Sequence, residues 1–114
     1  MKLYKCDEMK KKDDRPGMKA AIVHGDGLTL TRWEMKKGAD LADHSHPHAQ
    51  ITLLVSGGIR FRLTGGESFT ATAGDYLIFE PNERHGGEVL EDTIAIDAFS
   101  PAREDFKAQL GWED

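Results

Sequence analysis

The sequence has a single cysteine, Cys6, and no long hydrophobic run. One cysteine cannot form an intrachain disulfide, so the chain suits a reducing compartment. A membrane span needs about 20 consecutive apolar residues, and the N-terminus lacks the apolar core of a secretory signal peptide. These absences predict a cytoplasmic protein that has no membrane partner.

Basic side chains are scarce outside the N-terminus. Residues 1–19 hold seven Lys or Arg against four Asp or Glu, whereas the remaining residues hold eight against sixteen. Phosphate contacts need clustered Lys and Arg, so this acidic body argues against nucleic acid as a partner. The length of 114 residues is typical of one domain.

Short β-prone runs separated by Gly-rich turns dominate the chain. Turns are expected at Gly57-Gly58, Gly65-Gly66 and Glu91-Asp92. So many short strands predict an all-β sandwich or barrel whose mouth can hold one small ligand. The expected strands are residues 19–24, 28–35, 51–55, 59–63, 68–73, 76–79, 88–90 and 93–99.

Two segments fall outside this strand pattern. Residues 1–17 form a polar N-terminal segment ending at a Pro-Gly breaker, and we expect a single domain over residues 18–114. Near the C-terminus, Phe106 and Leu110 have the i, i+4 spacing of a helix, which is predicted at about residues 102–110.

Three imidazoles and one amide alternate along a seven-residue stretch, at His44, His46, His48 and Gln50. In an extended strand, alternate residues share a face, and neutral imidazole is the commonest metal ligand among side chains. The stretch therefore indicates a metal site. A His-rich surface loop is the alternative, and Pro47 permits it because proline is confined to strand edges and bulges.

Two stretches resemble the conserved motifs of the cupin family. The first motif has Gln50 where the family usually has Glu. In the second, Pro81 lies one place later than usual, and the second Gly and the trailing Asn of the motif are not matched. The matching positions are Gly38, His44, His46, Gln50 and Gly57 in the first motif, and Gly74-Asp75 through His85 in the second.

The resemblance to cupins implies a double-stranded β-helix, also called a jelly roll or cupin barrel, with a short C-terminal helix. It also implies one divalent transition metal held by His44, His46, Gln50 and His85. His48 does not fall on a ligand position and is expected behind the ligands or at the surface. Imidazole ligands do not distinguish Ni, Zn, Fe, Mn, Co and Cu.

The amide at Gln50 has an electrostatic consequence. Three neutral imidazoles and a neutral amide leave a divalent ion with its full charge, where Glu would cancel one unit. Such a site is a stronger Lewis acid and a better anchor for an anionic substrate. It also differs from the two-His-one-carboxylate set of many non-haem iron oxygenases.

The segment from Ile96 to Phe106 resembles the closing segment of the pectin-degradation cupins, which linearise 4,5-unsaturated monouronates released from pectin and alginate. This narrower resemblance implies that Asp97 is the catalytic acid/base and that Arg103 binds the substrate carboxylate. Phe99 would shape the pocket. The expected ligand is then a small anionic sugar acid.

Other interpretations of these residues remain open from the sequence. Asp97 could face solvent, Arg103 could merely pair with Glu104 or Asp105, and Phe99 could belong to the core. At the level of function, the rivals are another metal-dependent cupin enzyme, such as a small-molecule dioxygenase, and a non-catalytic ligand-binding or sensory cupin. The family resemblance further implies a homodimer that exchanges edge strands.

Overall fold

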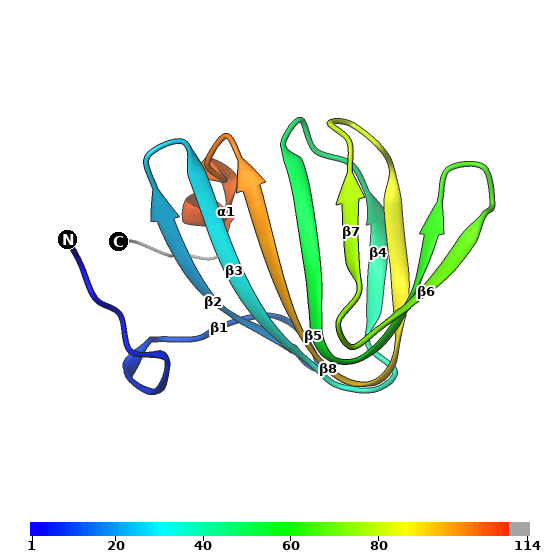
Figure 1. Ribbon diagram of the computed structural model, residues 1–114, viewed down its shortest axis with the longest axis horizontal. Coiled ribbons are helices and arrows are strands. Elements are labelled where there is room, and N and C mark those ends of the chain that lie inside the picture. Colours follow the sequence, from blue (N-terminus) through cyan, green and yellow to red (C-terminus); the bar gives the residue numbers. More distant parts are fainter. Residues whose placement is uncertain (110–114) are drawn as a thin grey trace.

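Two long antiparallel strands form the centre of the fold, β5 (Ala49–Leu63) and β8 (His85–Ser100). In this computed structural model, backbone structure is described for residues 1–109 and side chains for residues 1–106. The two strands pair along nearly their whole length, from Ala49 opposite Ser100 to Leu63 opposite His85. Each strand bends partway, so its two halves belong to different layers of the barrel (Figure 1).

The other strands pair with one half or the other of these two strands. The first layer adds β1 (Lys12–Arg15), β2 (Met18–Gly25), β3 (Leu28–Met35) and β7 (Tyr76–Phe79), and the second adds β4 (Asp40–His44) and β6 (Ser68–Thr72). Buried side chains from both layers meet in one core. The predicted all-β jelly roll is confirmed.

The core follows from the period-2 alternation of the strands. Along β3, Trp33 and Met35 are buried while Arg32 and Glu34, which alternate with them, are more exposed. Ile22 and Leu54 are fully buried in the first layer and Ile59 in the second, so apolar side chains of the two layers pack face to face.

The turns predicted at Gly57-Gly58 and Glu91-Asp92 are wrong, because β5 and β8 continue through them. The register between the two strands shifts around Gly57-Gly58, which is therefore a bulge and not a reversal of the chain. Gly57 has a φ of 87°, and a Cβ there would lie 2.7 Å from the Cα of Thr93. Only glycine allows this close approach at the bend. The turn at Gly65-Gly66 joins β5 to β6 as predicted.

The C-terminal helix, α1, spans Glu104–Gln109, within the predicted range. Leu110, used to predict it, lies outside the described residues. Among the helices that the structure describes, none is long and apolar enough to cross a membrane.

The N-terminal segment contributes more structure than its polar composition suggests. It contains a 3-10 turn, η1 (Cys6–Glu8), and then β1, which pairs with β2 as the edge strand of the first layer. Lys11 and Glu34 form an ion pair at 2.8 Å across this edge. The division at residue 17 stays a prediction.

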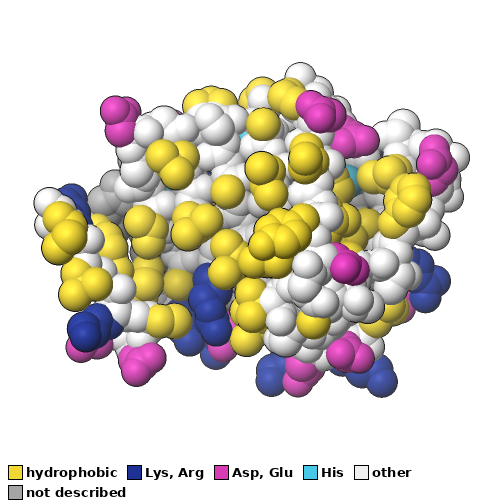
Figure 2. All heavy atoms as spheres, in the orientation of Figure 1, with side chains coloured by type: hydrophobic (Ala, Val, Ile, Leu, Met, Phe, Trp, Pro, Cys, Tyr) yellow, Lys and Arg dark blue, Asp and Glu magenta, His cyan; other side chains and the backbone are white. Residues whose placement is uncertain are grey.

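The outer face of the first layer is unusually apolar. Ile51 and Val55 of β5 are about half exposed, and Tyr76 and Ile78 of β7 are 72% and 67% exposed. Figure 2 shows hydrophobic side chains spread across the middle of this face, with charged side chains mainly toward its lower rim. Contiguous exposed apolar surface of this kind marks interaction sites. We therefore expect a second copy of the chain to bind this face, a different surface from the edge strands through which the family resemblance implies dimerisation.

If two chains associate through this face, Ile78→Lys will weaken the dimer, because the new charge must be buried without a partner. Analytical ultracentrifugation across a range of concentrations measures the change. Thr70→Lys, on the exposed surface of β6 in the second layer, serves as the control and should leave the association unchanged. A wild-type chain that sediments only as a monomer would contradict the predicted dimer.

Candidate functional site

Three imidazoles converge inside one end of the barrel. His44 is the last residue of β4 and His85 the first residue of β8, and the two are register partners. His46 comes from the loop between β4 and β5. One ring nitrogen from each of these residues lies within 4.8 Å of the others, which is the arrangement needed to share one ion.

Backbone carbonyl groups orient all three rings. The Nδ1 atom of each ring lies against the carbonyl oxygen of a residue two positions away, at 2.8 Å for His44, 3.0 Å for His46 and 2.9 Å for His85. Since a carbonyl can only accept, Nδ1 carries the proton and Nε2 keeps its lone pair. Hydrogen bonds of this kind are typical of histidines that bind metal through the other nitrogen.

Burial favours the neutral form of two of these rings. His46 and His85 are 7% and 4% exposed, and desolvation lowers the pKa of each imidazole below its usual value. A neutral imidazole is the form that binds a metal, so this environment favours ligation.

The four alternating donors do not lie on one strand, so that interpretation of the histidine row is wrong. β4 ends at His44, the next four residues form a loop, and β5 begins at Ala49. The His48 ring is outside the group of three, although its backbone carbonyl accepts from His46. Pro47 explains the break, because it cannot donate to a sheet ladder.

A glycine lets β4 lie close enough to β8 for the cluster to form. A Cβ on Gly86 would lie 2.7 Å from the backbone oxygen of Leu41. Any larger residue would therefore push β4 away and separate His44 from His85. The sequence pattern assigned no role to Gly86, although glycine within a strand signals a close backbone approach.

Gln50 begins a chain of polar side chains that leads away from the cluster. Its Oε1 atom lies 3.0 Å from His46 Nε2, and its Nε2 donates to Thr52 Oγ1 at 2.8 Å. Thr52 Oγ1 in turn donates to Asp97 Oδ1 at 2.6 Å. Thr52 was also missed, although positions 50 and 52 share one face of a strand.

Asp97 faces the interior and not solvent. It lies in the C-terminal half of β8 between Thr31 and Thr52, its register partners on the two neighbouring strands, and is 8% exposed. Burial raises the pKa of this carboxyl group to about 6, and hydrogen bonds from Thr52 and Gln50 partly oppose the effect.

Arg103 is also buried, and its main partner is another residue of the chain. Its Nε and Nη2 atoms donate to the two carboxylate oxygens of Asp105, at 2.9 and 2.7 Å. The guanidinium carbon lies 4.6 Å from the ring centroid of Phe99 and 3.8 Å from that of Phe106. Asp105 therefore already holds one edge of the guanidinium, which leaves Nη1 as the donor group for a ligand.

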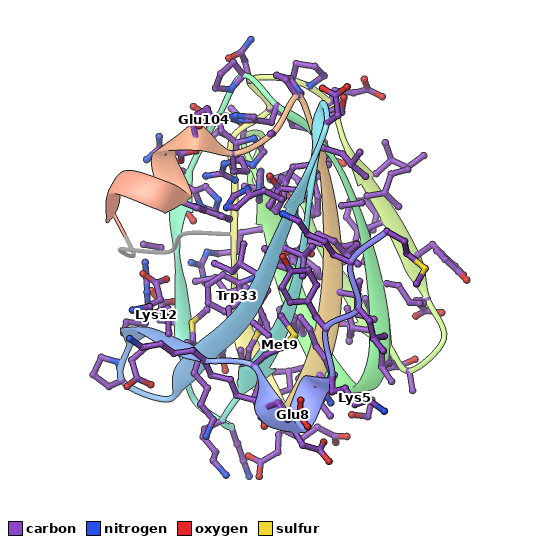
Figure 3. The ribbon with its side chains drawn as sticks, turned by 90° about the vertical axis from the view of Figure 1, so that its left-hand side faces the viewer. Lys5, Glu8, Met9, Lys12, Trp33 and Glu104 are labelled. Carbon is purple, nitrogen blue, oxygen red and sulfur yellow. The ribbon has the colours of Figure 1, made fainter. Side chains whose placement is uncertain are left out.

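A single cavity of about 980 Å³ brings all these groups together. Trp33 of β3 and Glu104, at the start of α1, both line this cavity (Figure 3). The wall includes every residue that the sequence predicted for the site: His44, His46, Gln50, His85, Asp97, Phe99 and Arg103.

Comparison with known proteins agrees with this architecture. Residues 31–97 match the Cupin domain family. The chain belongs to the cupin family. This cupin is 33% identical over 93 residues to the pectin degradation protein KdgF of Dickeya dadantii (strain 3937), a match that covers 79% of this chain and 84% of the relative.

Solved structures give the same result. KdgF from Halomonas sp. is similar with a TM-score of 0.85 and 31% identity, over 92% of this chain and 99% of that chain. An RmlC-like cupin from Shewanella frigidimarina NCIMB 400 is similar with a TM-score of 0.85 and 30% identity, over 91% and 94% of the two chains. The predicted family resemblance is confirmed.

The burial of Asp97 predicts a pH-dependent cost in stability. Because its pKa is raised from 3.8 to about 6, the folded state keeps a proton that the unfolded chain has lost between these values. Stability contributed by this group therefore falls as the pH rises through that window, by roughly 3 kcal/mol in all. The lowered pKa values of His46 and His85 act in the opposite direction, destabilising the fold as the pH falls below 6.5.

We expect Asp97→Asn to stabilise the metal-free protein, because the amide carries no buried charge. Urea unfolding of both proteins from pH 4 to pH 8 measures the difference, which should be small near pH 4 and reach its full size above pH 6. The histidine effect is common to both proteins and cancels. A difference that does not vary with pH would contradict the assigned pKa.

Proposed function

We propose that this cupin is a metal-dependent, non-redox enzyme that opens and ketonises 4,5-unsaturated monouronates. The observation that carries the proposal is a buried carboxyl group, with its pKa raised to about 6, in the same cavity as three converging imidazoles. The similarity to two KdgF proteins, one of them named as a pectin degradation protein, supports this substrate class.

The donor set fits a divalent transition metal. His44, His46 and His85 would bind through Nε2 and Gln50 through Oε1. The 3.0 Å approach of His46 Nε2 to Gln50 Oε1 brings two lone pairs together when Nδ1 holds the ring proton, and a shared cation satisfies both. When bound, the metal would polarise substrate oxygens and hold the carboxylate. The ligand types do not select among Ni, Zn, Fe, Mn, Co and Cu.

The residues of the chain supply proton transfer and orientation. The substrate is a cyclic hemiacetal with an enol ether and a carboxylate, so ring opening and ketonisation both need protons to move. In our proposal Asp97 moves them, since a carboxyl group with a pKa near 6 exchanges protons readily at neutral pH. Arg103 binds the substrate carboxylate through Nη1, and Phe99, which stacks against that guanidinium, shapes the pocket.

The test mixes metal-loaded protein with the product of a uronate lyase and follows the double-bond absorbance without oxygen. We expect the wild type to accelerate its loss and Asp97→Asn to lower kcat by about 100-fold or more. Asp26→Asn, in the exposed β2–β3 turn, is the matched control and should leave the rate unchanged. A wild-type rate no faster than the spontaneous reaction would refute the proposal.

Arg103→Lys separates binding from chemistry in the same assay. Lysine keeps the positive charge but loses the planar fork, so we expect KM to rise more than kcat falls. An unchanged KM would show that Arg103 serves only its ion pair with Asp105.

The rival functions give different results in these experiments. A dioxygenase would consume oxygen, and its Asp97→Asn variant would stay largely active. A ligand-binding or sensory cupin would be stabilised by the sugar acid without forming product. Neither outcome is compatible with Asp97 as the acid/base of an isomerase-type reaction.

A further inference from the structure

We propose that Thr52 is a positioning residue that determines which end of the Gln50 amide faces the three-histidine cluster. The inference rests on the metal site of the proposed function, but not on the identity of the substrate. Thr52 is 2% exposed and joins Gln50 to Asp97 through its hydroxyl group.

The hydroxyl group sets the direction of the hydrogen bonds. It has one proton, and the 2.6 Å contact with Asp97 Oδ1, an acceptor, uses it. The hydroxyl oxygen can then only accept, so it takes a hydrogen bond from the Gln50 Nε2 amino group at 2.8 Å. The other end of the amide, Oε1, is thereby directed toward His46 Nε2.

Nothing in the shape of the glutamine side chain would impose this orientation. The oxygen and nitrogen ends of an amide are nearly the same size, so rotation by 180° changes only the hydrogen bonds. A rotated amide would direct N–H groups at the histidine cluster, where they repel a cation and have no lone pair to donate. Thr52 therefore acts on the metal through Gln50 and does not touch the metal itself.

The neighbouring strand provides a matched control. Thr31 is register partner to Asp97 on β3, as Thr52 is on β5, and both threonines are almost completely buried. Among the side chains that the structure describes, the Thr31 hydroxyl has no hydrogen-bond partner, whereas that of Thr52 has two. Replacing either residue by Val keeps the β-branched shape. Only at position 52 does it remove a hydroxyl that joins Gln50 to Asp97, and the direct hydrogen bond between these two side chains stays.

The experiment measures Zn²⁺ and Ni²⁺ affinity of the full chain without substrate, by competition with a chromophoric chelator. We expect Thr52→Val to weaken metal binding by about 10- to 100-fold, as loss of an orienting contact does at other metal sites. Thr52→Ser should restore the affinity to within about threefold, because it restores the hydroxyl. Thr31→Val should bind metal like the wild type.

A second comparison distinguishes orientation of the amide from a general structural effect. In a Gln50→Glu background, either end of the side chain presents an oxygen, so Thr52→Val should cost much less affinity than in the wild type. Equal losses in both backgrounds would overturn the proposal, as would wild-type affinity in Thr52→Val. If Thr52→Val does not fold, Thr52→Ala takes its place, because it also lacks the hydroxyl. The same two outcomes would then overturn the proposal.

The metal-affinity measurement is independent of the uronate assay. Loss of metal affinity in Thr52→Val, combined with no turnover by any variant, would sustain the role of Thr52 and refute the proposed reaction. Wild-type metal affinity in Thr52→Val, combined with uronate turnover by the wild type, would refute the role of Thr52 and sustain the proposed reaction.

Discussion

The antiparallel register between β5 and β8 is the constraint on which the rest of the site depends. It places Gln50 opposite Phe99 and Thr52 opposite Asp97, with all four side chains directed into the barrel. Side chains alternate between the two faces of a sheet, so a slip of one residue in either strand would turn the two site residues of that strand toward solvent. Gly57 stabilises the arrangement indirectly, because it allows both strands to bend between the layers without losing their pairing.

The site contains buried ionisable groups that reduce the stability of the fold. Burial disfavours the charged forms of both Asp97 and the imidazoles of His46 and His85, and the fold retains all three within one cavity. The raised pKa lets the Asp97 carboxyl exchange protons near neutral pH. The same shift means that the ionised carboxylate destabilises the folded state. Such destabilised groups concentrate at functional sites because activity needs them. Asp105 neutralises the positive charge of the buried Arg103 at the same end of the barrel.

Much of the fold could be predicted because its signals are local. Alternating runs such as 28–35 and the Gly65-Gly66 hairpin follow from side-chain period and turn chemistry. The bulges at Gly57-Gly58 and Glu91-Asp92 could not be predicted in this way. A bulge and a turn use the same residue types, and they differ only in whether the pairing with a neighbouring strand continues. The histidine row was misjudged for a related reason, because Pro47 ended the extended segment that alternation requires.

The sequence by itself determined the family, the all-β class and seven of the residues that line the cavity, because motif spacing preserves which positions face inward. Only the tertiary structure decided how those residues act on one another. Thr52 joins Gln50 to Asp97, Asp105 holds Arg103, and Gly86 admits β4 beside His85. The first two depend on distances between side chains and the last on the approach of two backbones. Neither is encoded in the spacing of residues along the chain.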